Sequence, residues 1–213
     1  LSVWCHAQKS ASWLRARTPR HTGSDGGTLL GWNPYCNPLK NVWRKFYGEF
    51  LENDATAHGN EWEKPAGKVY IDAFQRHLNR LFIEQKSFET GIFHLLGRPI
   101  RLSKKRESDR YYLPPHARMW HIGMVVDPFN HWRGVSIDGL VTINGIPLIV
   151  VEIKCPYGSQ GNTALYISEP MYYIPQGQDG MYAMWRLYPS CIALHRVTYS
   201  PIFGLMVDLC AMD

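Results

Sequence analysis

The chain has 213 residues, a formal net charge of +5 and a sequence pI near 8.9. Hydrophobic residues make up 45% of the chain and charged residues 19%, a balance that excludes an intrinsically disordered or fibrous protein. The length suits one domain with a sizeable buried core, and the mild basic excess suits a phosphate-rich partner without establishing one.

Targeting signals and cysteines bear on the compartment. The longest apolar run, at about residues 146–151, is far shorter than a membrane span, and the first residues lack the pattern of a signal peptide. The five cysteines lie at wide, irregular spacings without a CxxC pair, which favours reduced thiols over a disulfide framework or a zinc site. We therefore expect a protein of the cytoplasm or nucleus that is neither secreted nor inserted into a membrane.

Helical signals dominate the first half of the chain. Residues 1–40 are rich in Trp, Arg, Gly and Pro and predict a short helix followed by loops. Residues 58–79 carry apolar side chains at helical spacing, with Asn60 as the expected N-cap and Pro65 expected in the first turn. A second helical stretch is expected over 76–96.

Strand signals dominate the second half. Three β-branched, apolar runs separated by turn residues predict strands at 124–126, 134–143 and 147–153. Residues 172–188 predict a helix in spite of one proline and two glycines, and 191–199 with 203–209 predict a final hairpin. The order of elements indicates a mixed α/β domain.

The most informative segment is a hairpin expected over residues 134–156. An Asn-Gly pair at 144–145 between two strand-like runs is a strong signal for a tight turn. Asp138 interrupts the first apolar strand, and Glu152 and Lys154 interrupt the second. Charged groups in such strands are costly unless they are paired or bind a metal.

Two interpretations of these three charged residues stay open on the residues alone. One is a buried salt bridge to Lys154, or a strand end that reaches solvent. The other is a metal centre, because Glu152 and Lys154 share one face of their strand. Two carboxylates there would hold a hard divalent cation that activates a water and stabilises charge at a phosphate, while Lys154 orients the nucleophile or neutralises the phosphate.

The register of this hairpin separates the two interpretations. A strict two-residue loop at 144–145 places Asp138 opposite Val151, on the other face from Glu152. A metal site needs both carboxylates on one face. We therefore predict a three-residue loop at 143–145 with Gly145 in the left-handed conformation, or an equivalent bulge nearby.

The same residues carry a resemblance. The segments SIDGL at 136–140 and EIKCP at 152–156 resemble the S-x-D-G-L…E-x-K-C-P pattern of the lambda exonuclease, or YqaJ-type viral recombinase, family. That family belongs to the PD-(D/E)xK nucleases and is related to viral alkaline exonucleases. The resemblance implies a restriction-endonuclease-like core in which helices flank a central mixed β-sheet. It also implies a single nuclease domain over 1–213, with a catalytic core from about residue 58.

Two further segments resemble the family in the same order. The sequence HGNEWE at 58–63 is similar to the helix that presents a glutamate to the metal site, which implies that Glu63 is a third carboxylate. The sequence YIPQGQ at 173–178 resembles the Y-x-x-Q-x-Q-x-x-M helix. That match implies Gln176 in the active site and Gln178 facing DNA or the core. The proline and glycines around these glutamines predict a kinked helix.

The N-terminal segment, up to about residue 57, resembles the part of the family that binds the 5′-phosphate of a DNA end. The match rests on WLRAR at 13–17 followed by TGS at 22–24, and it implies Arg17 and Ser24 as phosphate ligands with Arg15 beside them. The chemistry agrees, since a guanidinium, a hydroxyl and glycine-freed backbone N–H groups suit a phosphate. The charge run at 104–106 belongs to no family motif and is a solvated face or a DNA-backbone contact.

The resemblance implies a 5′→3′ exonuclease that acts on double-stranded DNA ends in viral or phage recombination or DNA processing. Its cofactor would be Mg²⁺, with Mn²⁺ as a substitute, held by Asp138, Glu152 and the backbone carbonyl of Ile153. Glu63 would support a second metal or its water, and Lys154 with Gln176 would position the nucleophilic water. A single-strand annealing protein is a further expected partner, and oligomer formation stays open.

Two alternatives remain beside the exonuclease. One is an endonuclease of the same PD-(D/E)xK superfamily, which would cut a closed circle. The other is a non-catalytic DNA-binding scaffold on that fold, which would release no nucleotides with magnesium.

Overall fold

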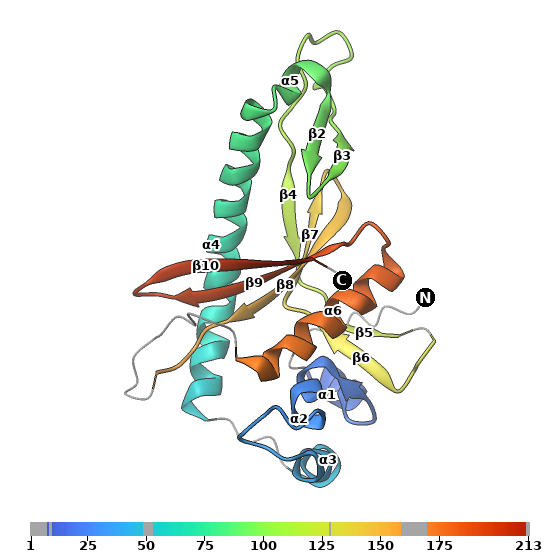
Figure 1. The fold of residues 1–213 in the computed structure, drawn as a ribbon, viewed down its shortest axis with the longest axis vertical. Helices are drawn as coiled ribbons and strands as arrows, with labels where there is room; N and C mark the ends of the chain where they lie inside the picture. The colour runs from blue at the N-terminus through green and yellow to red at the C-terminus, as the bar shows by residue number, and fades with distance from the viewer. Residues whose placement is uncertain (1–7, 9, 49–52, 128, 159–169, 212–213) are drawn as a thin grey trace.

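The computed structural model describes residues 8, 10–48, 53–127, 129–158 and 170–211 (Figure 1). Its centre is a five-stranded mixed sheet in the order β10-β9-β8-β7-β4. These strands are β4 (Ala117–Trp120), β7 (Gly139–Ile143), β8 (Ile146–Lys154), β9 (Ala193–Ser200) and β10 (Gly204–Ala211). Strands β8 and β9 run parallel, and the other neighbours in this sheet are antiparallel. The expected mixed sheet and the expected final hairpin are therefore confirmed.

Two smaller β structures accompany the central sheet. One is a three-stranded sheet, in the order β1 (His21–Thr22), β6 (Arg133–Ser136) and β5 (Met124–Val126). The other is the hairpin of β2 (Ile92–Leu95) and β3 (Arg98–Arg101). The strand expected over 134–143 is thus divided: β6 pairs in the small sheet, β7 in the central one. Asp138 lies in the bend where the chain passes from one sheet to the other.

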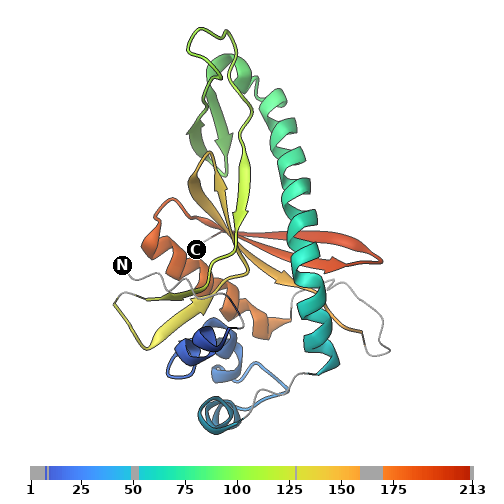
Figure 2. The same ribbon diagram turned by 180° about the vertical axis from the view of Figure 1, so that it is seen from behind.

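The long helix α4 (Asp54–Glu84) runs along one side of the molecule (Figures 1 and 2). Its N-cap is Asn53, whose side chain accepts from the Thr56 N–H at 2.9 Å, so the prediction of Asn60 as N-cap was wrong. The prediction of Pro65 in the first turn was also wrong, because Pro65 lies inside the helix. A proline there removes one backbone hydrogen bond. Tertiary packing of the apolar face outweighs that loss.

The helix expected over 76–96 was only partly correct. Helix α4 ends at Glu84, and the one-turn helix α5 (Ser87–Thr90) follows it. Gly91 ends α5 in the left-handed conformation, with φ 71°. The β2–β3 turn then has two left-handed residues in succession at 96–97, as the tight turns of hairpins require.

Helix α6 (Ile174–Leu187) covers the face of the central sheet opposite to α4 (Figure 1). Because side chains alternate along β8, Val151 packs in the cluster with α4, and Val150 packs in the cluster with α6. The proline and the glycine from which a kink was predicted have another explanation in the structure. Pro175 lies in the first turn, where its missing N–H costs nothing, and a Cβ at Gly177 would lie 2.5 Å from Leu194. Close packing of helix on sheet therefore accounts for that glycine.

The β7–β8 hairpin has the two-residue loop that its Asn-Gly pair favours. Asn144 and Gly145 have φ 50° and 83°, and Ile143 faces Ile146 across the turn. The predicted three-residue loop was therefore wrong.

The alternative form of that prediction, an equivalent bulge nearby, is confirmed. The register shifts after the first two pairs, so that Thr142 faces Pro147 but Val141 faces Ile149, which leaves Leu148 as the extra residue. Pro147 has no N–H to give to a ladder, and strands accommodate proline at bulges of this kind. The shift brings Gly139 opposite Val151, and by the same register Asp138, in the bend before β7, comes beside Glu152.

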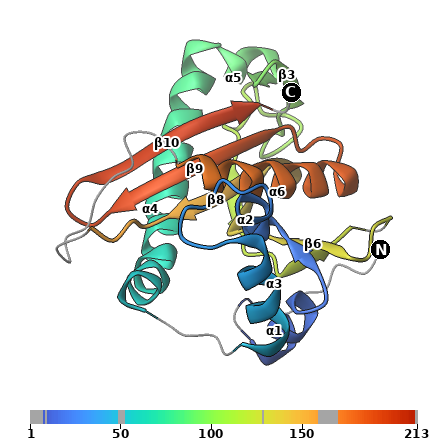
Figure 3. The same ribbon diagram turned by 60° about the horizontal axis from the view of Figure 1, so that its bottom comes forward.

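The N-terminal part of the chain packs below α6 (Figure 3). It consists of α1 (Ala11–Arg17), β1, the 3₁₀ turn η1 (Gly23–Asp25), α2 (Gly26–Leu29) and α3 (Pro38–Tyr47), and a second 3₁₀ turn, η2 (Met171–Tyr173), leads into α6. A Cβ on Gly27 would lie 2.1 Å from the Tyr172 carbonyl oxygen, so only glycine allows this contact with η2. The short first helix was expected from the sequence, whereas α3 was not.

Four of the five cysteines lie in the described part of the chain. The cysteines at 36, 155, 191 and 210 are unbridged, as predicted, while Cys5 lies outside the described residues. In the part of the chain that the structure describes, no helix combines the length and apolar character needed to cross a bilayer.

Candidate active site

Asp138 and Glu152 meet at the edge of the central sheet. The Asp138 Oδ2 atom accepts a hydrogen bond from the Ile153 N–H at 2.7 Å, which fixes its carboxylate beside β8. Burial raises the pKa of Asp138 well above its usual range, and repulsion from Glu152 and then from Glu63 adds to the rise. Attraction to Lys154 opposes it only in part. The structure thus brings together the two carboxylates that the sequence predicted on one face.

Lys154 and Gln176 form a hydrogen-bond network with Glu152. The Lys154 Nζ donates to Glu152 Oε1 at 2.7 Å and to Gln176 Oε1 at 3.1 Å, and the Gln176 amide donates to the same Glu152 oxygen. The Glu152 side chain is 4% exposed and that of Lys154 is 21% exposed. The Lys154 ammonium also lies 4.5 Å from the centre of the Tyr173 ring, a cation–π contact that orients it.

Glu63 lies on α4 and affects both Asp138 and Cys155. Besides burial, its negative charge contributes to the raised pKa of each group. Its role as a third carboxylate of the metal site stays a prediction. The structure also agrees with one part of the salt-bridge interpretation, since Lys154 pairs with Glu152.

The donor set suits a hard divalent cation. Within the described ranges, no group of three or more His, Cys, Asp or Glu side chains could hold a metal ion. The predicted set combines the carboxylates of Asp138 and Glu152 with the Ile153 carbonyl, and Glu63, predicted as a third carboxylate, does not complete such a group in the described residues. Mg²⁺ is commonly held by one or two carboxylates and keeps several waters. Because the crowded carboxylates repel one another, a cation between them would also relieve that repulsion.

Arg17 and Ser24 lie together, as the sequence predicted. The Arg17 Nη2 atom donates to Ser24 Oγ at 2.8 Å and to Thr22 Oγ1 at 3.4 Å, and the guanidinium lies 4.3 Å from the centre of the Trp13 ring. Burial lowers the pKa of Arg17, against attraction from Asp25 and Glu152. Glu152 is thus close enough for its charge to act on this cluster, which we call the Arg17–Ser24 cradle.

Asp25 supports the cradle, and the sequence reasoning missed it. Its carboxylate accepts from both the N–H and the hydroxyl of Thr22 at 2.7 Å, from Asn41 at 3.0 Å, and from Lys45. Burial acts to raise the pKa of Asp25, but these partners, Lys45 above all, hold it below its usual range. The signal was present in the sequence, because a Thr followed by an acidic residue three positions later is typical of a capping box.

A second link joins the cradle to β6, the strand that precedes Asp138. The Trp13 indole N–H donates to Ser136 Oγ at 2.9 Å, two residues before Asp138. Helix α1 is therefore anchored to the segment that carries the first carboxylate.

The remaining predicted contacts lie at the surface. Arg15 and Gln178 are both exposed, and their DNA-binding roles stay predictions. The charge run at 104–106 lies in the connection from β3 to β4, at the opposite end of the molecule from α3 (Figure 1). That position favours the interpretation of this run as a solvated face.

The raised pKa of Asp138 has a measurable consequence for stability. Because the folded protein holds a proton at Asp138 more tightly than the unfolded chain does, stability falls as the pH rises from the unfolded pKa to the folded one. Asp138→Asn removes that cost and keeps an oxygen for the Ile153 N–H. We expect a higher Tm than wild type in EDTA at about pH 8, and a smaller gain at about pH 3. Thermal unfolding at both pH values measures this, and a lower Tm at the higher pH would contradict it.

Comparisons with known proteins agree with this arrangement. An alkaline exonuclease (LHK-Exo) from Laribacter hongkongensis is similar in structure, with a TM-score of 0.56 and 17% sequence identity over 96% of this chain and 83% of that one. The structure of LHK-Exo in complex with dAMP is similar with a TM-score of 0.57, the same identity and the same coverage. The expected mixed α/β architecture, a central mixed sheet flanked by helices, is thereby confirmed as the fold. No curated protein matches the chain.

The sequence match is to a family model. The model of the YqaJ-like viral recombinase domain matches residues 12–183, which include the cradle, both carboxylate strands and the Gln176 helix. The chain therefore belongs to the YqaJ-like viral recombinase family.

Proposed function

We propose that this chain, a nuclease by its family and fold, is a metal-dependent exonuclease that degrades double-stranded DNA from its 5′ ends. The observation that carries the proposal is the position of Arg17, whose guanidinium is close enough to the Glu152 carboxylate to be attracted by it. A phosphate-binding cradle beside a carboxylate–lysine pair suits an enzyme that holds a strand end and cuts near it. The similar LHK-Exo structure holds dAMP, a nucleotide, which supports this proposal.

The metal would be Mg²⁺, with Mn²⁺ as a substitute. Asp138, Glu152 and the Ile153 carbonyl would hold it, and Glu63 would support a second ion or its water. A bound divalent cation would supply an activated water and neutralise charge that develops on the phosphate.

The chain's own residues would complete the chemistry. Lys154 would lose part of its pairing with Glu152 when a cation takes that carboxylate, which frees its ammonium for the attacking water or the phosphate. Gln176 would orient the Lys154 ammonium, because the Lys154 Nζ donates to Gln176 Oε1 at 3.1 Å. Tyr173 would restrict the same ammonium from the other side.

The cradle would grip the 5′-phosphate. The Arg17 guanidinium has two donor edges, and a bidentate contact with phosphate is stronger and more directional than a single bond. Ser24 Oγ lies 2.8 Å from that guanidinium, so both groups would donate hydrogen bonds to oxygens of the same phosphate. This grip would set the end at which degradation begins.

A time course on three DNA substrates tests the proposal. Linear duplexes with a 5′-phosphate or a 5′-hydroxyl and a closed circle are incubated with Mg²⁺, with Mn²⁺ and with EDTA. We expect degradation of the linear forms only, faster with the 5′-phosphate, and a label at the 3′ end released last. Cleavage of the circle would instead identify an endonuclease, and no nucleotide release with either metal would indicate a non-catalytic scaffold.

Arg17→Ala is expected to remove most of the preference for a 5′-phosphate. Loss of a charge-assisted contact to phosphate weakens binding by about tenfold or more, while the 5′-hydroxyl substrate has no such contact to lose. The ratio of kcat/KM for the two linear duplexes measures the effect. Arg80→Ala is the matched control, since Arg80 is exposed on α4 and has no predicted role in DNA binding. An unchanged ratio in Arg17→Ala would dismiss the role.

The wider setting is part of the same proposal. The enzyme would be a single nuclease domain that acts in viral or phage recombination, in the cytoplasm or nucleus, beside a single-strand annealing protein. A pull-down of such an annealing protein with the purified chain would examine that partner directly.

A further inference from the structure

Helix α3 is amphipathic, but its polar side faces the protein. Asn41 and Lys45, one turn apart, both bond to the Asp25 carboxylate. The opposite side carries an outward apolar stripe of Leu39, Val42, Trp43, Phe46 and Tyr47. All ten residues of α3 are described, and none of them is buried. A helix that attaches to its own protein through polar groups leaves its apolar side for another molecule.

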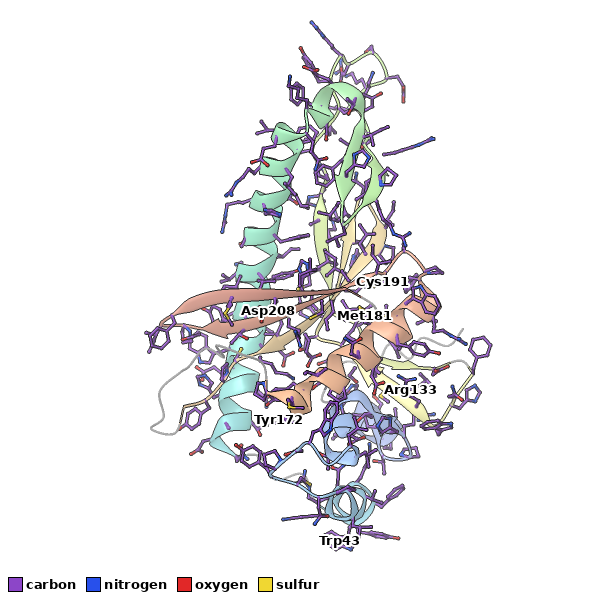
Figure 4. All side chains as sticks on the ribbon, viewed as in Figure 1. Trp43, Arg133, Tyr172, Met181, Cys191 and Asp208 are labelled. Carbon is purple, nitrogen blue, oxygen red and sulfur yellow. The ribbon has the colours of Figure 1, made fainter. Side chains whose placement is uncertain are left out.

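The exposure of this outward stripe is large. Leu39 is 84% exposed, Trp43 60% and Tyr47 78%. Trp43 lies at the foot of the molecule in Figure 4, on the helix farthest from α5. Tyr35 in the preceding loop is 80% exposed and adds a further ring to this end. Contiguous apolar surface of this kind marks an interaction site in a folded protein.

The charged residues of α3 itself have one sign. The helix carries Lys40, Arg44 and Lys45 and no aspartate or glutamate, and Lys45 pairs with Asp25. Lys40 and Arg44 are exposed and lie one turn apart along the edge of the stripe. The surface is therefore complementary to a polyanion, and its aromatic rings suit a polyanion that carries flat bases.

The outward stripe is also connected to the proposed phosphate-binding cradle. Asp25 bonds to Thr22 on one side and to Asn41 and Lys45 of α3 on the other. Thr22 in turn contacts Arg17. One buried carboxylate thus holds α3 at a set distance from the place where a DNA end would be gripped.

We propose that the outward stripe of α3 binds single-stranded DNA by stacking of its bases on Trp43, Phe46 and Tyr47. This inference rests on the proposed function, because resection of a duplex from its ends generates single strands at this site. The ring faces are available for stacking with bases. The ring centroids of Trp43 and Tyr47 are 6.3 Å apart and the ring planes form an angle of 42°, so the two rings do not stack face to face on each other. Lys40 and Arg44 would follow the phosphates.

The test is the affinity for a fluorescent oligothymidine strand, measured by anisotropy in EDTA so that no cleavage occurs. Trp43→Ala/Phe46→Ala is expected to weaken binding by about tenfold or more, since each base–aromatic stack contributes substantially. Trp43→Phe should retain most of the affinity. Arg44→Ala should lower the slope of log Kd against log salt by about one. Phe203→Ala is the matched control, because Phe203 is 63% exposed on the β9–β10 turn and should leave the affinity unchanged.

Three results would overturn the inference. An unchanged affinity in the double variant, with an unchanged Tm, would remove the role of the rings. Sedimentation that shows a wild-type oligomer dissociated by the double variant, at unaltered DNA affinity, would identify a surface for a second copy. Binding to anionic phospholipid vesicles that the double variant loses, without a change toward DNA, would identify a membrane surface. This binding assay needs no metal and no cleavage. Its result can therefore be told apart from a failure of the proposed nuclease activity.

Discussion

Lys154→Ala is expected to reduce the cleavage of linear duplex DNA by at least about a hundredfold, with DNA binding nearly intact. The Lys154 ammonium is the cationic group between Glu152 and Gln176, and no other side chain in this network can donate a charge-assisted bond to the attacking water. Its removal leaves the buried Glu152 carboxylate beside Asp138 without its lysine. A metal would then bind, but the water would lack its second positioning group.

Single-turnover cleavage of a 5′-phosphorylated duplex and anisotropy in EDTA measure these two effects separately. Lys154→Arg keeps the charge but replaces a compact ammonium with a planar fork, so it should recover only part of the activity. Lys68→Ala is the control for general loss of positive charge, because Lys68 is exposed on α4. Full activity of Lys154→Ala would refute the proposed assignment of the site.

Gly27→Ala is expected to have the second large effect, although Gly27 touches no catalytic residue. A Cβ there would lie 2.1 Å from the Tyr172 carbonyl oxygen and 2.8 Å from the Tyr172 Cα atom. Both atoms belong to the backbone at the entry to α6, so neither can turn aside as a side chain would. The N-terminal part must shift away from α6, which costs about 1–3 kcal/mol.

The shift should also be visible in the reaction. Arg17 and Ser24 would move relative to Glu152, so Gly27→Ala should lose the preference for a 5′-phosphate while it retains slow metal-dependent cleavage. Urea unfolding and the two linear duplexes measure stability and preference. Gly59→Ala is the control: nothing lies within 4 Å of its added Cβ inside α4, and it should gain about 0.5–1 kcal/mol. Equal stability of Gly27→Ala and wild type would contradict the clash.

Local patterns account for the parts of the fold that the sequence predicted well. The hairpin around Asn144-Gly145 depends on residues that are neighbours in the chain, although its loop has two residues and not the three that were expected. The need for a bulge that brings Asp138 and Glu152 onto one face follows from the same local pattern. The exact place of the bulge was not predictable in this way. It depends on Pro147, which has no N–H to donate and so does not suit a regular ladder.

Tertiary packing accounts for what the sequence did not predict. Helix α4 continues through Pro65 because Tyr70 and Phe74 beyond it are buried against the sheet, which no local rule reports. Asp25 was missed because its partners Asn41 and Lys45 are distant in sequence. Helix α3 was missed because its apolar residues face outward. They do not pack against the core, which is what an apolar pattern at helical spacing usually indicates.

The single extra residue at Leu148 places a constraint on the evolution of this hairpin. Glu152 and Lys154 keep their orientation toward Asp138 only while the number of residues between them has its present parity. One residue inserted or deleted at the tip would shift the register of the strand by one position, so that each following side chain would point to the opposite face of the sheet. Relatives of this chain should therefore vary in the length of this hairpin by pairs of residues, or carry a second bulge that restores the frame.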